Sequence, residues 1–187
     1  MTIRKRLKAG FTLVELMIVV AIVGILAVLA IYGVRKYIAN AKTAEAKNTL
    51  GKIQKDAIAA FEGEKLAKAA VMDEGESTET IRAMCANAVP VPGTAPAAKK
   101  YQSKASDWQQ GDAVTGWKCL KFEMTAPQYY SYDYKVTAVS GEGQSFQAIA
   151  LGDLNGDTKT STFTARGAIE NGRLKASPTI EEVDPEE

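Results

Sequence analysis

The chain contains no histidine, and it has only two cysteines among its 187 residues. Without histidine it offers no Ser-His or Cys-His pair for nucleophilic catalysis. It also has no glycine-rich loop of the kind that cradles phosphate and no cluster with metal-ligand spacing. The sequence therefore gives no support for an enzyme, and it predicts no cofactor.

Acidic residues are missing from the first ten positions, which hold four basic residues: Arg4, Lys5, Arg6 and Lys8. The formal net charge of the whole chain is +1, so the remainder without these ten residues is mildly acidic. A chain of that charge is not suited to neutralising many phosphates, and nucleic acid is not indicated as a partner.

Charge is also absent from Leu16 to Val34, in an apolar run that begins at Phe11 and is interrupted only by Glu15. About 20 apolar residues cross the roughly 30 Å hydrocarbon core of a bilayer, and the basic residues before the run place the N-terminus in the cytoplasm. The run is longer than the apolar region of an ordinary signal peptide. A plain signal peptide and a plain single-pass anchor are the simpler alternatives.

Glu15 is a functional candidate because a carboxylate at the centre of a membrane helix costs about 2.5–3.5 kcal/mol. The segment around it, Lys8-Ala9-Gly10-Phe11-Thr12-Leu13-Val14-Glu15-Leu16, resembles the processing motif of type IV prepilins. The resemblance implies that a prepilin peptidase cleaves after Gly10, that Phe11 is then N-methylated, and that Glu15 acts in assembly.

Physical reasoning on the charges agrees with this resemblance. Cleavage after Gly10 would create a positive amine on Phe11, and burying that amine without a partner is costly. Glu15 supplies the opposite charge, from the same chain or from a neighbouring subunit. The alternative is that Glu15 only lies at the membrane interface.

The helical pattern continues past the apolar run to about Glu62. Apolar residues recur at the spacing of an amphipathic helix at Leu50, Ile53, Ala57, Ile58 and Phe61. From Gly116 the period changes to two, which predicts strands over Trp117–Met124, Tyr130–Val136, Phe146–Ala150, Thr160–Ala165 and Arg173–Ala176.

Short glycine-marked turns between these strands indicate an antiparallel meander with one face on the helix. The fold class is therefore α+β, a long N-terminal α-helix packed on an antiparallel β-sheet head. The order of residues from Gly116 to Tyr134 also resembles the sheet segment of type IVa pilins. The alternating Tyr130, Tyr132 and Tyr134 indicate sheet packing, with an aromatic recognition face as the alternative.

Between helix and sheet, short helices are expected over Glu64–Met72 and Thr78–Asn87, followed by a proline-rich irregular loop. The expected organisation is a leader over 1–10, an apolar membrane or filament-core helix over 11–34, an amphipathic continuation over 35–62, a helix–sheet loop over 63–115, an antiparallel sheet over 116–177 and a frayed acidic tail over 178–187.

Cys85 and Cys119 lie beyond the membrane run, where an oxidising compartment favours a disulfide. Two free buried thiols are the alternative.

Asp153, Asn155 and Asp157 alternate as oxygen ligands do in a calcium loop. However, Thr158 and Thr164 stand where the full signature requires glycine and glutamate. A tight turn between two strands is the simpler interpretation, and we assign no metal.

The resemblance implies a structural subunit of a type IV pilus that polymerises through its apolar helix into a surface filament for motility, adhesion or aggregation. Its partners would be other pilin subunits, the prepilin peptidase, the inner-membrane pilus assembly machinery and the membrane. The unassembled chain would span the inner membrane once with its head in the periplasm, and the filament would be extracellular. Two alternatives stay open: a type II secretion pseudopilin, and a single-pass membrane-anchored binding domain that does not polymerise.

Overall fold

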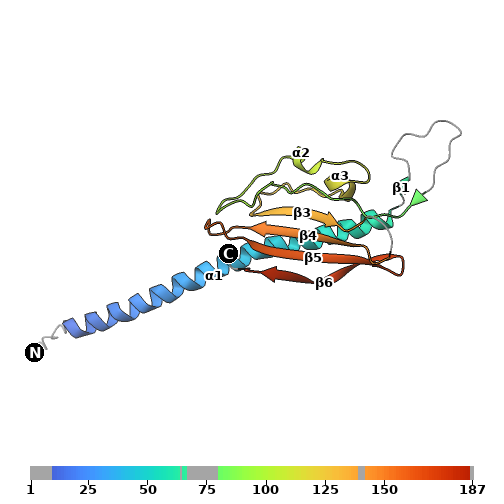
Figure 1. The fold of residues 1–187 in the computed structure, drawn as a ribbon. Helices are drawn as coiled ribbons and strands as arrows, with labels where there is room; N and C mark the ends of the chain where they lie inside the picture. The colour runs from blue at the N-terminus through green and yellow to red at the C-terminus, as the bar shows by residue number, and fades with distance from the viewer. Residues whose placement is uncertain (1–9, 64, 67–79, 139–141, 186–187) are drawn as a thin grey trace, which may run out of the picture. The chain divides into compact units, whose positions relative to one another are not determined.

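The computed structural model describes residues 10–63, 65–66, 80–138 and 142–185. They belong to two compact units, Met1–Ala39 and Asn40–Glu187, and each unit is described by itself. Figure 1 shows the elements: α1 (Leu13–Glu62), β1 (Lys65–Leu66), β2 (Thr80–Ile81), α2 (Ala105–Trp108), α3 (Gly116–Leu120), β3 (Tyr130–Val136), β4 (Ser145–Gly152), β5 (Ser161–Glu170) and β6 (Arg173–Val183). The expected leader lies outside the described residues except for Gly10.

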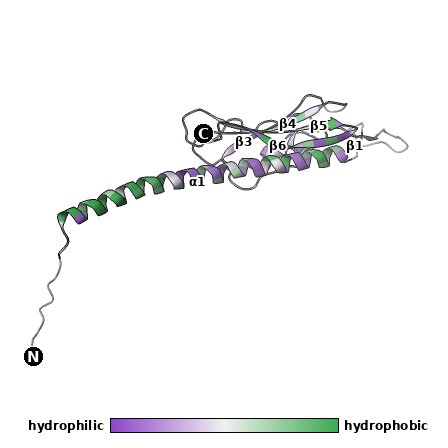
Figure 2. Cartoon of the chain, turned by 90° about the horizontal axis from the view of Figure 1, so that it is seen from below, coloured by the Kyte–Doolittle hydropathy of each residue, from purple (hydrophilic) through white to green (hydrophobic). Residues whose placement is uncertain are grey.

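The first unit contains the N-terminal part of α1, which is helical without interruption through Gly24 and Gly33. In the described part of the chain, every exposed large hydrophobic side chain except Val89 and Val183 lies between Phe11 and Ile38. Figure 2 shows this part of the helix as almost uniformly hydrophobic. By length and composition, α1 is the one helix of the described residues that could cross a membrane.

In the second unit, α1 is amphipathic and buries one stripe of side chains against the sheet. The stripe follows the three- and four-residue spacing of a helix face, at Thr43, Ala46, Leu50, Ile53, Ala57 and Phe61. Polar residues beside the stripe also contact the sheet. The Gln54 amide donates to the carbonyl oxygens of Arg166 and Ser177, at 3.2 Å each. The predicted packing of this helix on the sheet is confirmed.

The sheet has the order β3-β4-β5-β6, and every neighbouring pair is antiparallel. This is the meander that the period-two pattern predicts. Large side chains on the helix-facing side stand opposite small ones: Tyr132 pairs with Ala150, which pairs with Phe163. Phe146 pairs with Gly167, so closely that a Cβ on this glycine would collide with the Phe146 ring.

The three alternating tyrosines of β3 are fully buried, at 0% exposure each: Tyr130, Tyr132 and Tyr134. Tyr134 stacks on Phe146 with ring centroids 5.5 Å apart. The packing interpretation is therefore confirmed, and the interpretation as an aromatic recognition face is wrong.

Residues 82–128 form a layer at the β3 edge of the sheet. The backbone N–H groups of Ala88 and Val91 donate to the carbonyl oxygens of Tyr134 and Tyr132, each at 2.9 Å. These bonds close the β3 edge, which leaves β6 as the outer strand. Inside the layer the rings of Trp108, Trp117 and Phe122 form a buried cluster.

The strand predicted over Trp117–Met124 is wrong, because residues Gly116–Leu120 form the short helix α3. In a strand, Trp117 and Cys119 would face away from Leu120 and Phe122, yet all four side chains are buried. A short apolar run fits either a strand or a buried helix by its pattern. The meander consequently begins at Tyr130.

The helix predicted over Thr78–Asn87 is also wrong within the described residues. Thr80 and Ile81 form β2, and the Ala86 N–H donates to Val114 O instead of closing a helical turn. Of the helix predicted over Glu64–Met72, only Lys65–Leu66 is described, as strand β1; the rest lies outside the described residues.

The frayed tail expected over 178–187 is wrong as far as Val183, because β6 continues to that residue and pairs with β5 on both sides of a register shift between Ala165 and Gly167. Its acidic side chains form ion pairs with bases on neighbouring elements: Glu181 with Arg166 at 2.7 Å and Glu182 with Lys47 at 2.8 Å. Backbone pairing with β5 holds this acidic segment on the sheet, and the exposed ion pairs add a smaller contribution.

Candidate processing and assembly site

Gly10 and Phe11 lie just before α1, in a segment without regular structure. Both are exposed, and 82% of Phe11 is accessible. A peptide bond in such a segment is open to an enzyme, whereas a bond inside the helix is held by the helical hydrogen bonds.

Glu15 closes a capping box with Thr12 at the start of the helix. The backbone N–H and the hydroxyl of Thr12 donate to Glu15 Oε2, at 2.9 and 2.7 Å, and the Glu15 N–H donates to Thr12 Oγ1 at 3.3 Å. Each side chain thus satisfies a backbone donor that the first helical turn leaves unpaired. Sequence reasoning missed Thr12, although the spacing Thr-x-x-Glu is itself a signal for this box.

The capping box holds the Glu15 carboxylate toward the N-terminal end of α1. A negative charge is favourable there, because the first turn of a helix carries partial positive charge. The arrangement holds the Glu15 carboxylate against Thr12, the residue that follows Phe11, where it is available to a cation. It also gives the carboxylate polar partners within its own chain before any such cation is present.

The two cysteines are joined, as predicted: Cys85 and Cys119 form a disulfide across 34 positions, with Cα atoms 5.8 Å apart. Both are buried in the second unit. The bond ties the segment after β2 to α3, and the alternative of two free thiols is wrong.

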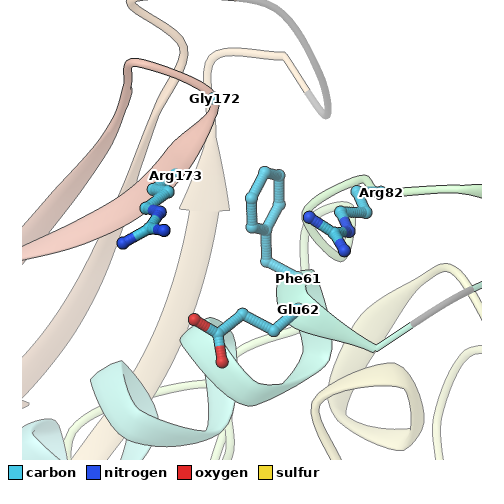
Figure 3. Close-up of a pocket in the computed structure, with 5 residues that line it drawn as sticks. All are labelled: Phe61, Glu62, Arg82, Gly172 and Arg173. Atoms are coloured by element: carbon cyan, nitrogen blue, oxygen red, sulfur yellow. The ribbon is translucent and has the colours of Figure 1, made fainter.

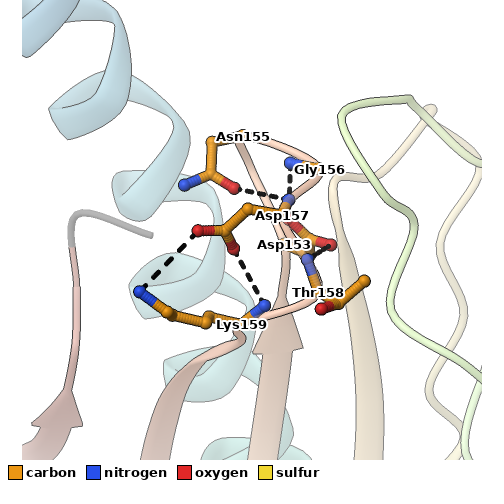
Figure 4. A network of polar contacts seen from close by, with 6 residues as sticks. All are labelled: Asp153, Asn155, Gly156, Asp157, Thr158 and Lys159. Atoms are coloured by element: carbon orange, nitrogen blue, oxygen red, sulfur yellow. Dashed lines mark hydrogen bonds and ion pairs between the residues drawn. The ribbon is translucent and has the colours of Figure 1, made fainter.

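The loop between β4 and β5 uses its polar side chains to build a turn (Figure 4). Asp153 Oδ1 accepts from the Gly156 N–H at 2.6 Å, and Asp153 Oδ2 accepts from the Thr158 N–H at 3.1 Å. Asn155 and Asp157 accept likewise from the N–H groups two residues ahead, both at 2.9 Å. These bonds agree with the turn interpretation.

No group of three His, Cys, Asp or Glu side chains that could hold a metal ion occurs among the residues that the structure describes. In the β4–β5 loop, Lys159 also forms an ion pair with Asp157, with 3.9 Å between Nζ and Oδ2. The calcium interpretation includes the Asn155 amide oxygen, which such a group does not count, and it stays a sequence prediction.

Comparison with known proteins places a family motif on the N-terminal segment. The family described as "Prokaryotic N-terminal methylation motif" matches residues 5–31. That range contains Gly10, Phe11 and Glu15.

Among curated proteins, the chain is 44% identical over 61 residues to the fimbrial protein EcpC of Eikenella corrodens, covering 33% of this chain and 39% of that protein. It is 46% identical over 71 residues to the type IV major alpha-pilin of Moraxella bovis, covering 37% and 42%. It is 61% identical over 41 residues to the type IV major fimbrial protein FimA of Dichelobacter nodosus, covering 22% and 26%. The chain spans less than half the length of each of these relatives.

No solved structure matches the chain. The methylation motif, the exposed apolar helix and the antiparallel sheet nevertheless define a class, a pilin-like α+β protein. Within that class, the matched motif and relatives support a type IV pilin.

Proposed function

We propose that this chain is a structural subunit of a type IV pilus, cleaved after Gly10 and N-methylated on Phe11. The observation that carries the proposal is the capped Glu15, inside the matched methylation motif, at the start of the exposed apolar part of α1, which has no other charge as far as Val34. The names of the matched relatives, a major pilin and fimbrial proteins, support the same function.

Assembly follows from what the first unit exposes. Apolar side chains from Phe11 to Ile38 are accessible on the isolated chain, and burying such a surface is favourable at about 25 cal/mol per Å². In the membrane, lipid covers this surface; in a filament, the helices of other copies replace lipid. The apolar contact is non-directional, so a charge pair is needed to fix which copy docks where.

Glu15 and the new Phe11 amine supply that charge pair. In the monomer, Thr12 satisfies the carboxylate. When an incoming subunit buries its amine, Glu15 of a neighbour offsets the desolvation of that charge. The pair sets the register of stacking between subunits.

The proposal also includes the partners of the chain and the cellular locations of its precursor and its filament. The precursor is anchored in the inner membrane by α1 with its second unit in the periplasm. A prepilin peptidase and an inner-membrane assembly machinery act on it, and the filament is extracellular, where it serves motility, adhesion or aggregation. The exposed apolar helix and the pilin relatives fit a membrane-anchored precursor and an extracellular pilus.

The test is a Glu15→Val variant, with processing and assembly measured separately. We expect the mature mass with N-terminal Phe11, because the cleavage site is unchanged, and few or no filaments by electron microscopy of sheared surface material. Glu62→Gln is the matched control, since it also removes a glutamate charge from α1 but is exposed and lies in the second unit. Wild-type filament yield from Glu15→Val would contradict the role given to the charge pair.

Sheared material from the wild type separates the proposal from its two alternatives. Long filaments composed mostly of this chain, identified by mass spectrometry, are expected from a pilus subunit. A complete lack of such filaments would favour the secretion pseudopilin or the non-polymerising anchored domain.

A further inference from the structure

A polar cavity of about 390 Å³ opens in the second unit, at the end of α1. Three separate parts of the chain line it: the last turn of α1 with Phe61 and Glu62, the residue after β2 with Arg82, and the β5–β6 turn with Gly172 and Arg173. In the view of Figure 3 the Phe61 ring stands between the side chains of Arg173 and Arg82, with the Glu62 carboxylate beside them.

The two arginines of this cavity have no ion-pair partner among the described residues. Arg166 in β5 differs from these two arginines, because its Nη2 lies 2.7 Å from Glu181 Oε2 in an ion pair. Among the lining residues that the structure describes, two guanidinium groups stand against one carboxylate, which is an excess of positive charge. Guanidinium groups present N–H donors in a planar fork that matches the two oxygens of a carboxylate.

The cavity is held by the β5–β6 turn and by the core. Phe61 is 5% exposed and belongs to the hydrophobic core. The β5–β6 turn has the left-handed φ angles of +52° at Asn171 and +70° at Gly172 that suit a tight hairpin. The Gly172 N–H also donates to Glu142 Oε1 at 2.7 Å. Arg173, the next residue, is therefore presented from a fixed turn.

The donor set indicates the chemistry of a ligand. The arginines suit a carboxylate, Glu62 accepts hydrogen bonds from hydroxyl groups, and the edge of Phe61 gives the site an apolar wall. The volume is near the lower end of the range for small-molecule pockets, about 300–1,000 Å³. We propose that this cavity binds a monosaccharide that carries a carboxylate, of the uronic-acid type, with Arg82 on the carboxylate and with Arg173 and Glu62, across the Phe61 ring, on ring hydroxyls.

All of the lining residues lie in the second unit, so the unassembled full-length chain in detergent micelles serves for the test. Glucuronate is titrated by isothermal calorimetry, with glucose as the neutral sugar and acetate as the anion without hydroxyls. We expect saturable glucuronate binding in the millimolar range and markedly weaker binding of both controls. The open, solvated position of the arginines limits the affinity.

Arg82→Gln and Arg173→Gln should each weaken glucuronate binding by about tenfold, because each removes a charge-assisted hydrogen bond. Arg166→Gln is the matched control and should bind like the wild type. All three arginines are exposed, so circular dichroism should show unchanged folding. The proposal is overturned by glucuronate binding that neither cavity variant changes, by equal binding of glucose or acetate, or by no saturable binding of glucuronate.

Discussion

Glu45 is a charged residue that the second unit holds at the boundary of its core. Its Oε1 accepts from the Tyr129 N–H at 2.9 Å and from the Tyr132 hydroxyl at 3.3 Å. Burial raises the pKa of Glu45, while these hydrogen bonds and the charge of Lys100 act in the opposite direction. The raised pKa means that the folded protein holds the proton on this carboxyl more tightly than the unfolded chain does.

We expect Glu45→Gln to change how stability depends on pH. The wild type loses stability as pH rises from the unfolded pKa of Glu45 through its raised folded pKa, because the charged form is disfavoured in the fold. Glutamine keeps the acceptor oxygen and cannot titrate. Melting temperatures measured from about pH 4 to about pH 7 should therefore shift in favour of the variant as pH rises.

The exposed Glu123 provides the control for this prediction. Glu123→Gln should follow the wild-type profile over the same pH range. A difference between Glu45→Gln and the wild type that stays constant with pH would refute the assignment of the effect to Glu45.

Within the sheet, the close approach of β4 and β5 at Gly167 gives a second prediction. A Cβ at this position would meet the Phe146 ring and would lie 2.8 Å from Lys175 O. We expect Gly167→Ala to lower the free energy of unfolding by about 1–3 kcal/mol, the usual cost of overpacking a core. Urea unfolding of the full chain measures the change.

The same substitution in α1 should have the opposite sign. Gly51 lies inside the helix, and a Cβ there would meet nothing within 4 Å. Alanine is favoured over glycine by about 1 kcal/mol in a helix interior, so Gly51→Ala should stabilise. Equal effects of the two substitutions would show that the sheet tolerates a methyl group between β4 and β5.

The disulfide between Cys85 and Cys119 gives a prediction for the layer of residues 82–128. A bond that closes 34 positions limits the unfolded chain, and the Cys85→Ser, Cys119→Ser double variant should lose about 2–4 kcal/mol of stability. Reduction of the wild type with dithiothreitol removes the same bond without a substitution and should give a similar loss. Identical urea midpoints for the oxidised and reduced protein would contradict the prediction.

At the scale of elements, sequence patterns predicted what local periodicity determines. The helix to Glu62 and the four strands from Tyr130 onward carry long, regular patterns, and the structure contains them. The run from Trp117 to Met124 was too short to distinguish strand from helix. The continuation of β6 to Val183 follows from its backbone pairing with β5, as between Val183 and Thr162, which the acidic composition of the segment does not reveal.

The two sites also differ in whether the sequence could predict them. Gly10, Phe11 and Glu15 are contiguous enough to form a sequence motif, and the family match covers all three. The cavity of Arg82 and Arg173 had no such signal, because the fold alone brings these distant residues to one place. A pattern of neighbouring residues in the sequence cannot predict a site of that kind.

For the whole molecule, the apolar surface of the first unit predicts how the full-length chain behaves. Exposed apolar side chains from Phe11 to Ile38 require lipid, detergent or other copies to cover them. We expect the unassembled chain to stay in the membrane pellet after an alkaline carbonate wash and to need detergent for extraction. Release into the wash would contradict a membrane-anchored precursor.

The two tryptophans, Trp108 and Trp117, are both buried in the layer of residues 82–128, with ring centroids 5.1 Å apart. Tryptophan fluorescence of this protein is consequently a local probe, since all of the emission originates in that layer and none in α1 or the sheet. Far-ultraviolet circular dichroism is instead dominated by the long helix. Recording both signals in one denaturation experiment shows directly whether the disulfide-linked layer separates from the rest before the helix melts.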